Sequence, residues 1–231
     1  MSAPSADRPA LRRGAAPDRW LVLQLADGTF PSGGFAHSAG LEAATVLGAL
    51  DGAGIEAFLD ASLRQIGRAA LPFVRAAADE PARLAALDDA YDATLPMVAP
   101  NRASRAQGRA LASAAARVWD HLGGVAEHAR LGPAHHAPVF GAVFGALGVS
   151  PDDALAAYLH GAARGILSAG VRLGLIGPLE AQQLHAARAP LFGELVEAAH
   201  GLGPEDAAQT APLIEIFAAL HERLDGRMFQ S

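Results

Sequence analysis

Cysteine and lysine are both missing from this chain, and each absence excludes several chemistries. Without cysteine the chain has no disulfide, no Cys-ligated zinc or iron–sulfur site and no thiol nucleophile. All 18 cationic side chains are Arg, so a Walker A lysine and a Schiff-base lysine are excluded as well. Because 24 acidic residues leave a net charge of −6, the chain offers no favourable overall field to nucleic acid or to an anionic membrane.

Residues that favour β-strands are scarce, and this scarcity points to the fold class. Val, Ile and Thr together number 21, whereas Ala alone accounts for 55 of the 231 residues. Ala has the highest helix propensity, and β-branched side chains favour strands. Neither a fixed-period repeat nor a change of composition divides the chain into separate units. The sequence therefore predicts an all-α fold, a single-domain helical bundle of roughly eight to ten helices.

Long apolar runs are missing too. A membrane-spanning helix needs about 18 to 20 consecutive apolar residues, and no stretch of the chain reaches that length. The apolar stretch 20–26 is short, is interrupted by Gln24 and is not followed by a small-residue cleavage site, so it does not resemble a signal peptide. We therefore expect a soluble, cytoplasmic protein.

Pro and Gly divide the chain into helical stretches. Residues 1–17 contain several breakers and no apolar periodicity, which predicts a flexible N-terminal arm. Residues 18–225 show the three-and-four apolar spacing of a helical domain, and residues 226–231 form a C-terminal tail. Within the domain we expect helices at about 18–26, 36–49, from 55 to a kink or end at Pro72, and at about 81–95, 101–122, 139–147, 150–176, 179–199 and 212–224.

One short segment is close to a catalytic motif. Residues 36–40, Ala-His-Ser-Ala-Gly, nearly match the Gly-x-Ser-x-Gly turn of serine hydrolases. That motif needs a strand that delivers the serine to a sharp turn, and here a Pro-Gly loop precedes it. The pattern favours a helix entry with small residues for packing. A small helical serine hydrolase that uses Ser38 and His37 stays open as an alternative function.

Nine histidines raise the question of a metal site. His135 and His136 are adjacent, and adjacent residues on a helix point in different directions. The sequence contains no His-x-x-x-His pair, so we expect no tightly bound metal and no other cofactor. A free-standing nickel carrier that uses these two histidines is the second alternative. The glycine loop 28–34 lacks the lysine of a phosphate-binding loop, which disfavours a nucleotide site.

The most specific signal in the chain lies in residues 23–43. A helix leads through a Pro-x-Gly loop into a helix start of the form Ser-x-Gly-Leu-Glu. The matching positions are Pro31, Gly33, Phe35, Ser38, Gly40, Leu41 and Glu42, with further matches at 104–111, 136–141, 146–148, 221–224 and 227–231. In these features, which are spread over nearly everything after residue 18, the chain resembles the urease accessory protein UreF family.

The resemblance implies a role without catalysis. Members of that family are all-helical homodimers that join two other accessory proteins, UreD (also called UreH) and the GTPase UreG, for nickel insertion into apo-urease. The implied partners are therefore UreD/UreH, UreG and, through the complex, apo-urease. Catalytic and cofactor-binding residues are not implied for this chain.

We expect three groups of residues to bind these partners. The loop and the helix start contribute Pro31, Gly33, Gly34, Phe35, His37, Ser38, Gly40, Leu41 and Glu42. Arg102, Arg105 and Arg109 are three and four apart, so they share one helix face and form a cationic stripe suited to UreG or its nucleotide. The tail contributes Arg227, Met228, Phe229 and Ser231.

Two further expectations concern packing. An exposed Phe and Met near a chain end are costly unless something covers them, so the tail is expected to order against UreD. Gly161, Gly165 and Ala169 are four apart, and small residues at this spacing allow a second helix to approach closely. That helix is expected within the chain, while the homodimer is expected chiefly from the resemblance.

Overall fold

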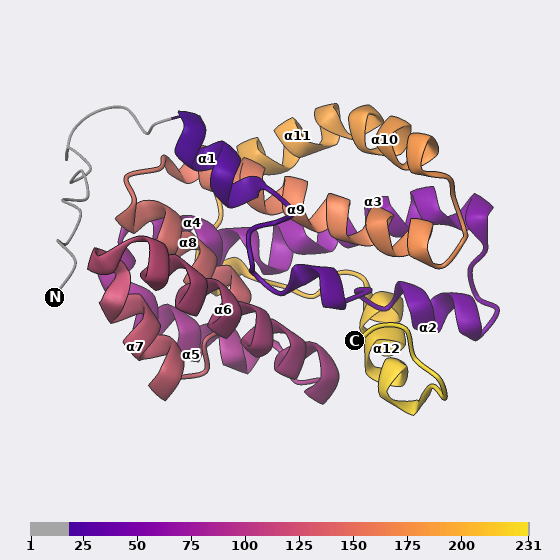
Figure 1. The fold of residues 1–231 in the computed structure, drawn as a ribbon, viewed down its shortest axis with the longest axis horizontal. Helices are drawn as coiled ribbons and strands as arrows, with labels where there is room; N and C mark the ends of the chain where they lie inside the picture. Colours follow the sequence, from indigo (N-terminus) through magenta and orange to yellow (C-terminus); the bar gives the residue numbers. More distant parts are fainter. Residues whose placement is uncertain (1–18, 231) are drawn as a thin grey trace, which may run out of the picture.

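The computed structural model describes residues 19–230 and shows an all-α protein (Figure 1). Residues 1–18, Ser231 and the side chain of Phe35 lie outside the described part, and with them the expected N-terminal arm. Residues 19–230 contain twelve α-helices and no strand. The all-α class is thus confirmed, and the expected eight to ten helices are too few.

The helices follow one another with short connections. They are α1 (Arg19–Ala26), α2 (Leu41–Val46), α3 (Ile55–Ala69), α4 (Leu71–Asp79), α5 (Leu84–Thr94), α6 (Val98–Val118), α7 (Gly123–Leu131), α8 (His136–Ala146), α9 (Pro151–Arg172), α10 (Pro178–Ala187), α11 (Ala189–Ala199) and α12 (Pro212–Leu220). Two short 3-10 turns matter for the site, η1 (Gly34–Ala36) and η6 (His221–Arg223).

Local sequence explains why the helices number twelve. Pro72 lies in the first turn of α4, and Pro190 lies in the first turn of α11, so each proline separates two helices at a point where its missing N–H costs nothing. The helix α7 is not predicted from the sequence, because Gly123 and Gly124 at its start are typical of a loop. The helix expected at 36–49 is wrong at its start, since Gly40 has φ +86° and α2 begins only after it.

The helix α8 is the centre of the core. Its residues 137–144 are all buried, which fits the continuous apolar run in the sequence. The backbones of α8 and α4 touch, because Gly141 and Gly145 have no Cβ: a Cβ at either position would overlap the carbonyl oxygen of Val74 or Ala78. Figure 1 shows α9 running across the middle of the molecule, with α10 and α11 along one side and α12 beside the C-terminus.

The long helix α9 starts as the sequence predicts. Ser150 caps it by accepting a hydrogen bond from the Asp153 N–H at 3.1 Å, and Pro151 occupies the first turn. Within residues 19–230 no helix, α9 included, is long and apolar enough to cross a membrane.

The contact between α4 and α8 gives a direct test of the fold. We expect Gly145→Ala to lower the free energy of unfolding by about 2 kcal/mol or more, because the new methyl group has no room against the α4 backbone. Gly161→Ala is the matched control, since no neighbouring segment of the described chain lies within 4 Å of the place that its methyl group would take. There the better helix propensity should stabilise the protein by about 0.5 to 1 kcal/mol. Urea denaturation of both variants measures the difference, and equal effects would contradict the packing.

Candidate partner-binding site

The loop between α1 and α2 has a defined shape that depends on glycine. Gly33 has φ +77° and Gly40 has φ +86°, a region that other residues rarely adopt. At Gly40 a side chain would also press on α12, because a Cβ would lie 3.0 Å from the Ala218 nitrogen and 3.2 Å from the Ile214 carbonyl oxygen. The loop and α12 therefore pack backbone against backbone.

A buried carboxylate joins this loop to the C-terminus. Glu42, in the first turn of α2, is only 4% exposed. Its oxygens accept hydrogen bonds from the Met228 N–H at 2.7 Å and from the Phe229 N–H at 3.2 Å, and they lie 2.6 Å from Nε2 of the buried His221. Residues at opposite ends of the described chain thus meet at one side chain.

The hydrogen bonds keep Glu42 ionised. Burial opposes the charge, but the hydrogen bonds from Met228, His221 and Phe229 outweigh it and hold the pKa of Glu42 below its ordinary value. A carboxylate in that state accepts several hydrogen bonds at once, and each is stronger than one between neutral groups. The charge of Glu42 is therefore part of the contact with the tail.

The tail residues divide into inward and outward groups. Phe229 is 5% exposed, and the Arg172 guanidinium lies 4.1 Å above the centre of its ring. The Gln230 N–H donates to the Ala36 carbonyl oxygen at 2.8 Å. Arg227 and Met228 point outward, with Met228 52% exposed. Residues 226–230 thus lie against the chain itself, and an ordering of the tail by UreD stays a prediction.

Ser38 is a buried residue two positions before Gly40, the N-cap of α2, and does not have the setting of a nucleophile. Its side chain is fully buried, and its Oγ accepts from the Glu42 N–H at 3.5 Å, a long contact at the start of α2. Its neighbour His37 is half-buried, and burial, followed by the nearby His221, lowers the pKa of His37. Residues 19–230 supply no strand before Ser38, so the geometry that a hydrolase elbow needs is missing there.

The two adjacent histidines separate, as expected from their positions. Both ring nitrogens of His135 are engaged, Nδ1 with Ser104 Oγ at 3.1 Å and Nε2 with Asp92 Oδ1 at 2.7 Å. His136 instead turns into a cavity, and burial lowers its pKa to about 4. No group of three or more metal-ligating side chains occurs in the described part of the chain. The histidine pair of the nickel-carrier alternative is therefore not a joint site.

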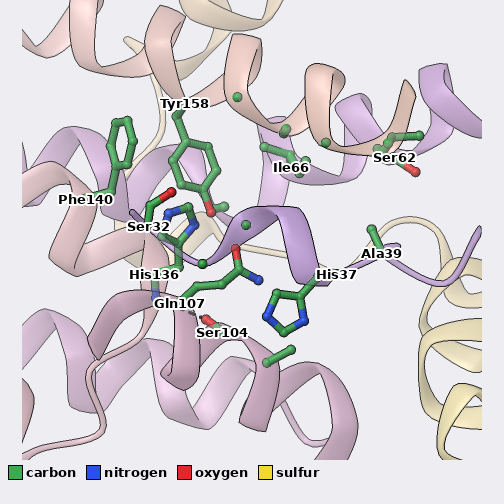
Figure 2. Close-up of a pocket in the computed structure, with 18 of the residues that line it drawn as sticks. Ser32, His37, Ala39, Ser62, Ile66, Ser104, Gln107, His136, Phe140 and Tyr158 are labelled. Atoms are coloured by element: carbon green, nitrogen blue, oxygen red, sulfur yellow. Dashed lines mark hydrogen bonds between the residues drawn. The ribbon is translucent and has the colours of Figure 1, made fainter. Parts of the chain in front are cut away.

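The cavity is a feature that the sequence does not predict. It has a volume of about 670 Å³ and lies between the loop 28–40 and helices α3, α6, α9 and α12. Its walls are mostly apolar, and Figure 2 shows the rings of His136 and Tyr158 side by side among its polar groups. Gly161 and Gly165 line it, so no helix of the described chain packs on these two glycines, contrary to expectation.

The expected arginine stripe is divided in the structure. Arg105 Nε donates to the Pro133 carbonyl oxygen at 3.0 Å, and Arg109 Nη2 donates to that of Gly132 at 3.3 Å. These two side chains therefore hold the connection between α7 and α8. Arg102, one turn earlier on α6, forms an ion pair with Glu222 of η6. Spacing alone predicts the shared helix face but not these contacts.

The fold and the site together define an all-helical protein in which a buried carboxylate near the N-terminal loop binds the protein's own C-terminal tail. Comparison with known proteins identifies the family: the UreF family model matches residues 50–189. Urease accessory protein F of Arabidopsis thaliana is 34% identical over 222 residues, covering 92% of both chains. The rice protein of that name (Oryza sativa subsp. indica) is 33% identical over 219 residues, 91% of this chain and 84% of its own. Urease accessory protein UreF of Mycobacterium sp. (strain JLS) is 32% identical over 212 residues, 91% of this chain and 97% of its own.

This chain belongs to the UreF family of urease accessory proteins. The family consists of accessory proteins in urease maturation and not of enzymes, so the serine-hydrolase alternative is wrong. The resemblance seen in residues 23–43 is confirmed.

The neutral His136 gives a prediction for the pH dependence of stability. Its pKa is about 4 in the folded protein and about 6.5 in an unfolded chain. The unfolded state therefore takes up more protons between these values, and its uptake at this site lowers stability by about 3 kcal/mol as the pH falls from 6.5 to 4.

We expect His136→Gln to lose that part of the pH dependence. Urea denaturation at several pH values between 4 and 7 measures it, and His121→Gln, at an exposed position, controls for the loss of one histidine. If the free energy of unfolding depended on pH in the same way for the unsubstituted chain and for His136→Gln, the lowered pKa of His136 would be contradicted.

Proposed function

We propose that this protein bridges UreD/UreH and the GTPase UreG during nickel insertion into apo-urease. It does so as a cytoplasmic homodimer that recruits and orients partners without chemistry of its own. Nickel is the cargo of the complex, and no residue of this chain is assigned to it. The observation that carries the proposal is the junction of the tail with α2 and the loop 31–40, where Glu42 binds the tail and the Gln230 N–H donates to the Ala36 carbonyl oxygen. Both segments belong to the stretches that resemble the UreF family.

The C-terminal tail is the proposed contact for UreD. Phe229 and Glu42 fix its backbone on the domain, which leaves Arg227 and Met228 exposed beside the loop. Exposed apolar side chains next to an arginine are typical of the residues that anchor protein interfaces. The side chain of Phe35 and Ser231 belong to the same proposal on the strength of the resemblance.

Deleting residues 226–231 should abolish UreD binding and leave the helical content unchanged, because the helices of the described chain end before them. Met228→Asp tests the same contact with the backbone intact, since it places a charge where an apolar contact is proposed. Size-exclusion chromatography with light scattering, on the chain mixed with UreD and UreG, measures both complex formation and the homodimer. Full UreD binding by both variants would refute the tail as the contact.

The proposed contact for UreG is the exposed end of the arginine stripe. Arg105 and Arg109 hold the connection between α7 and α8. A loss of UreG binding after a charge reversal at either position would therefore not distinguish a disturbed fold from a lost contact. In the described part of the chain, Arg102 makes its polar contact with the side chain of Glu222. It is therefore the position at which a positive charge can be removed with least effect on the fold.

We expect Arg102→Glu to weaken UreG recruitment about tenfold at low salt, and to do so less as the salt concentration rises. Glu222→Gln is the matched control, because it removes the ion pair and keeps the arginine. Pull-down of UreG at two salt concentrations measures the effect. Equal recruitment of UreG by Arg102→Glu and by the unsubstituted chain would show that Arg102 does not contact UreG.

A further inference from the structure

Three polar side chains that line the 670 Å³ cavity have no hydrogen-bond partner among the described residues. Ser62 of α3 is only 5% exposed, and its hydroxyl is unpaired there. Burial raises the pKa of Tyr158 on α9 and lowers that of His136 on α8 to about 4, and no hydrogen bond within the described chain offsets the burial of either side chain. Because buried polar groups are normally paired, these three groups point to a bound molecule that supplies the missing partners.

Arg164 and Glu215 are the charged side chains among the described lining residues, and both are already paired. Arg164 Nη1 donates to the Ala26 carbonyl oxygen at 2.6 Å, and Glu215 accepts from the side-chain amide of Gln65. Burial raises the pKa of Glu215, and the low pKa of His136 keeps its imidazole neutral at pH 7. A charged molecule would lose its hydration here without gaining a free counter-ion, so the cavity favours an uncharged one.

The wall formed by α9 leaves open space beside a group of aromatic rings. Gly161 and Gly165 lie in this wall, and no neighbouring segment of the described chain lies within 4 Å of the place that a Cβ would take at either position. The ring centre of Tyr158, one turn before Gly161, is 5.1 Å from that of Phe140 and 5.2 Å from that of His136. Figure 2 shows these three rings grouped together. An aromatic ring of a bound molecule can therefore lie on the glycines and contact this group.

We propose that the cavity binds an uncharged aromatic small molecule that carries a hydrogen-bonding group. Its ring lies against Gly161 and Gly165, and its polar group pairs with the Tyr158 hydroxyl and the His136 imidazole. Ligand sites typically have volumes of about 300 to 1,000 Å³ and apolar walls with a few polar groups, and this cavity has both properties. The proposal does not depend on the bridging function.

Two naphthalene compounds that differ in charge test the proposal on the full chain. Gly33 and Ala39 line the cavity and are exposed, so both compounds can reach it from solvent. We expect 2-naphthol to bind at one molecule per chain with a dissociation constant of about 1 mM or tighter, which is what a modest ligand efficiency gives for its size. The anion 2-naphthoate has the same ring and should bind at least about tenfold more weakly, because its charge would be buried without a partner. Isothermal titration calorimetry at pH 7 measures both. No binding of 2-naphthol, or equal or tighter binding of 2-naphthoate, would overturn the proposal.

Gly161→Leu blocks the cavity from α9. The new side chain meets open space and Leu favours a helix more than Gly does, so the variant should keep its fold and unfold at no lower urea concentration. It should weaken the binding of 2-naphthol at least about tenfold. Gly193→Leu is the matched control, because Gly193 is an exposed glycine of α11 outside the cavity lining, and it should leave binding unchanged. Undiminished binding by Gly161→Leu would overturn the site. If Gly161→Leu does not fold, Gly165→Leu decides in its place.

Tyr158→Phe tests the polar end of the site. The variant keeps the ring and loses the hydroxyl, and its stability should not fall because that hydroxyl has no partner within the described chain. The loss of one hydrogen bond to the ligand predicts about fivefold weaker binding of 2-naphthol. An unchanged dissociation constant would overturn the pairing with Tyr158.

Discussion

The ionised carboxylate of Glu42 joins the start of α2 to η6 and to the C-terminal tail. It lies in the apolar interior, where a charge is tolerated only if hydrogen bonds replace the lost water. Its partners come from η6 and from the tail, far along the chain from α2. The positions of the tail and of η6 relative to α2 therefore depend on this side chain.

A second buried carboxylate in the molecule binds backbone amides in the same way. Asp88 of α5 is fully buried, and it accepts from the Ala134 N–H at 2.6 Å and from the His135 N–H at 2.7 Å. His128 lies 2.6 Å from the same carboxylate. In both places an acidic side chain on a helix captures the main-chain amides of a segment that has no helical hydrogen bonds of its own. Ala-rich helices offer few large side chains for such a task, and here buried acidic side chains fix the connections.

Residue patterns predict the helices of this protein well and its connections poorly. The start of α9 at Ser150 follows from local chemistry, and the burial of α8 follows from its apolar run. The family follows from Pro31 to Glu42, because a loop of that form needs particular residues at fixed positions. The partners of Glu42 could not be predicted, since they lie about 180 residues away and two of them are backbone groups. A hydrogen bond from a backbone N–H does not restrict the residue type that supplies it, so the sequence does not reveal it.

The cavity could not be predicted for a related reason, and its origin connects the fold to the proposed function. Small residues four apart on α9, such as Gly161 and Gly165, indicate a close neighbour, but they equally create empty space when none arrives. Within the described chain that neighbour is missing, and the loop 28–40 spans the gap. Neighbouring helices fix the position of this loop: Gly40 packs on the backbone of α12, and a Cβ at Gly33 would lie 3.4 Å from the Ala110 Cβ on α6. The surface proposed for partner binding and the wall of the cavity therefore belong to the same segment, and α12 packs directly on that segment at Gly40.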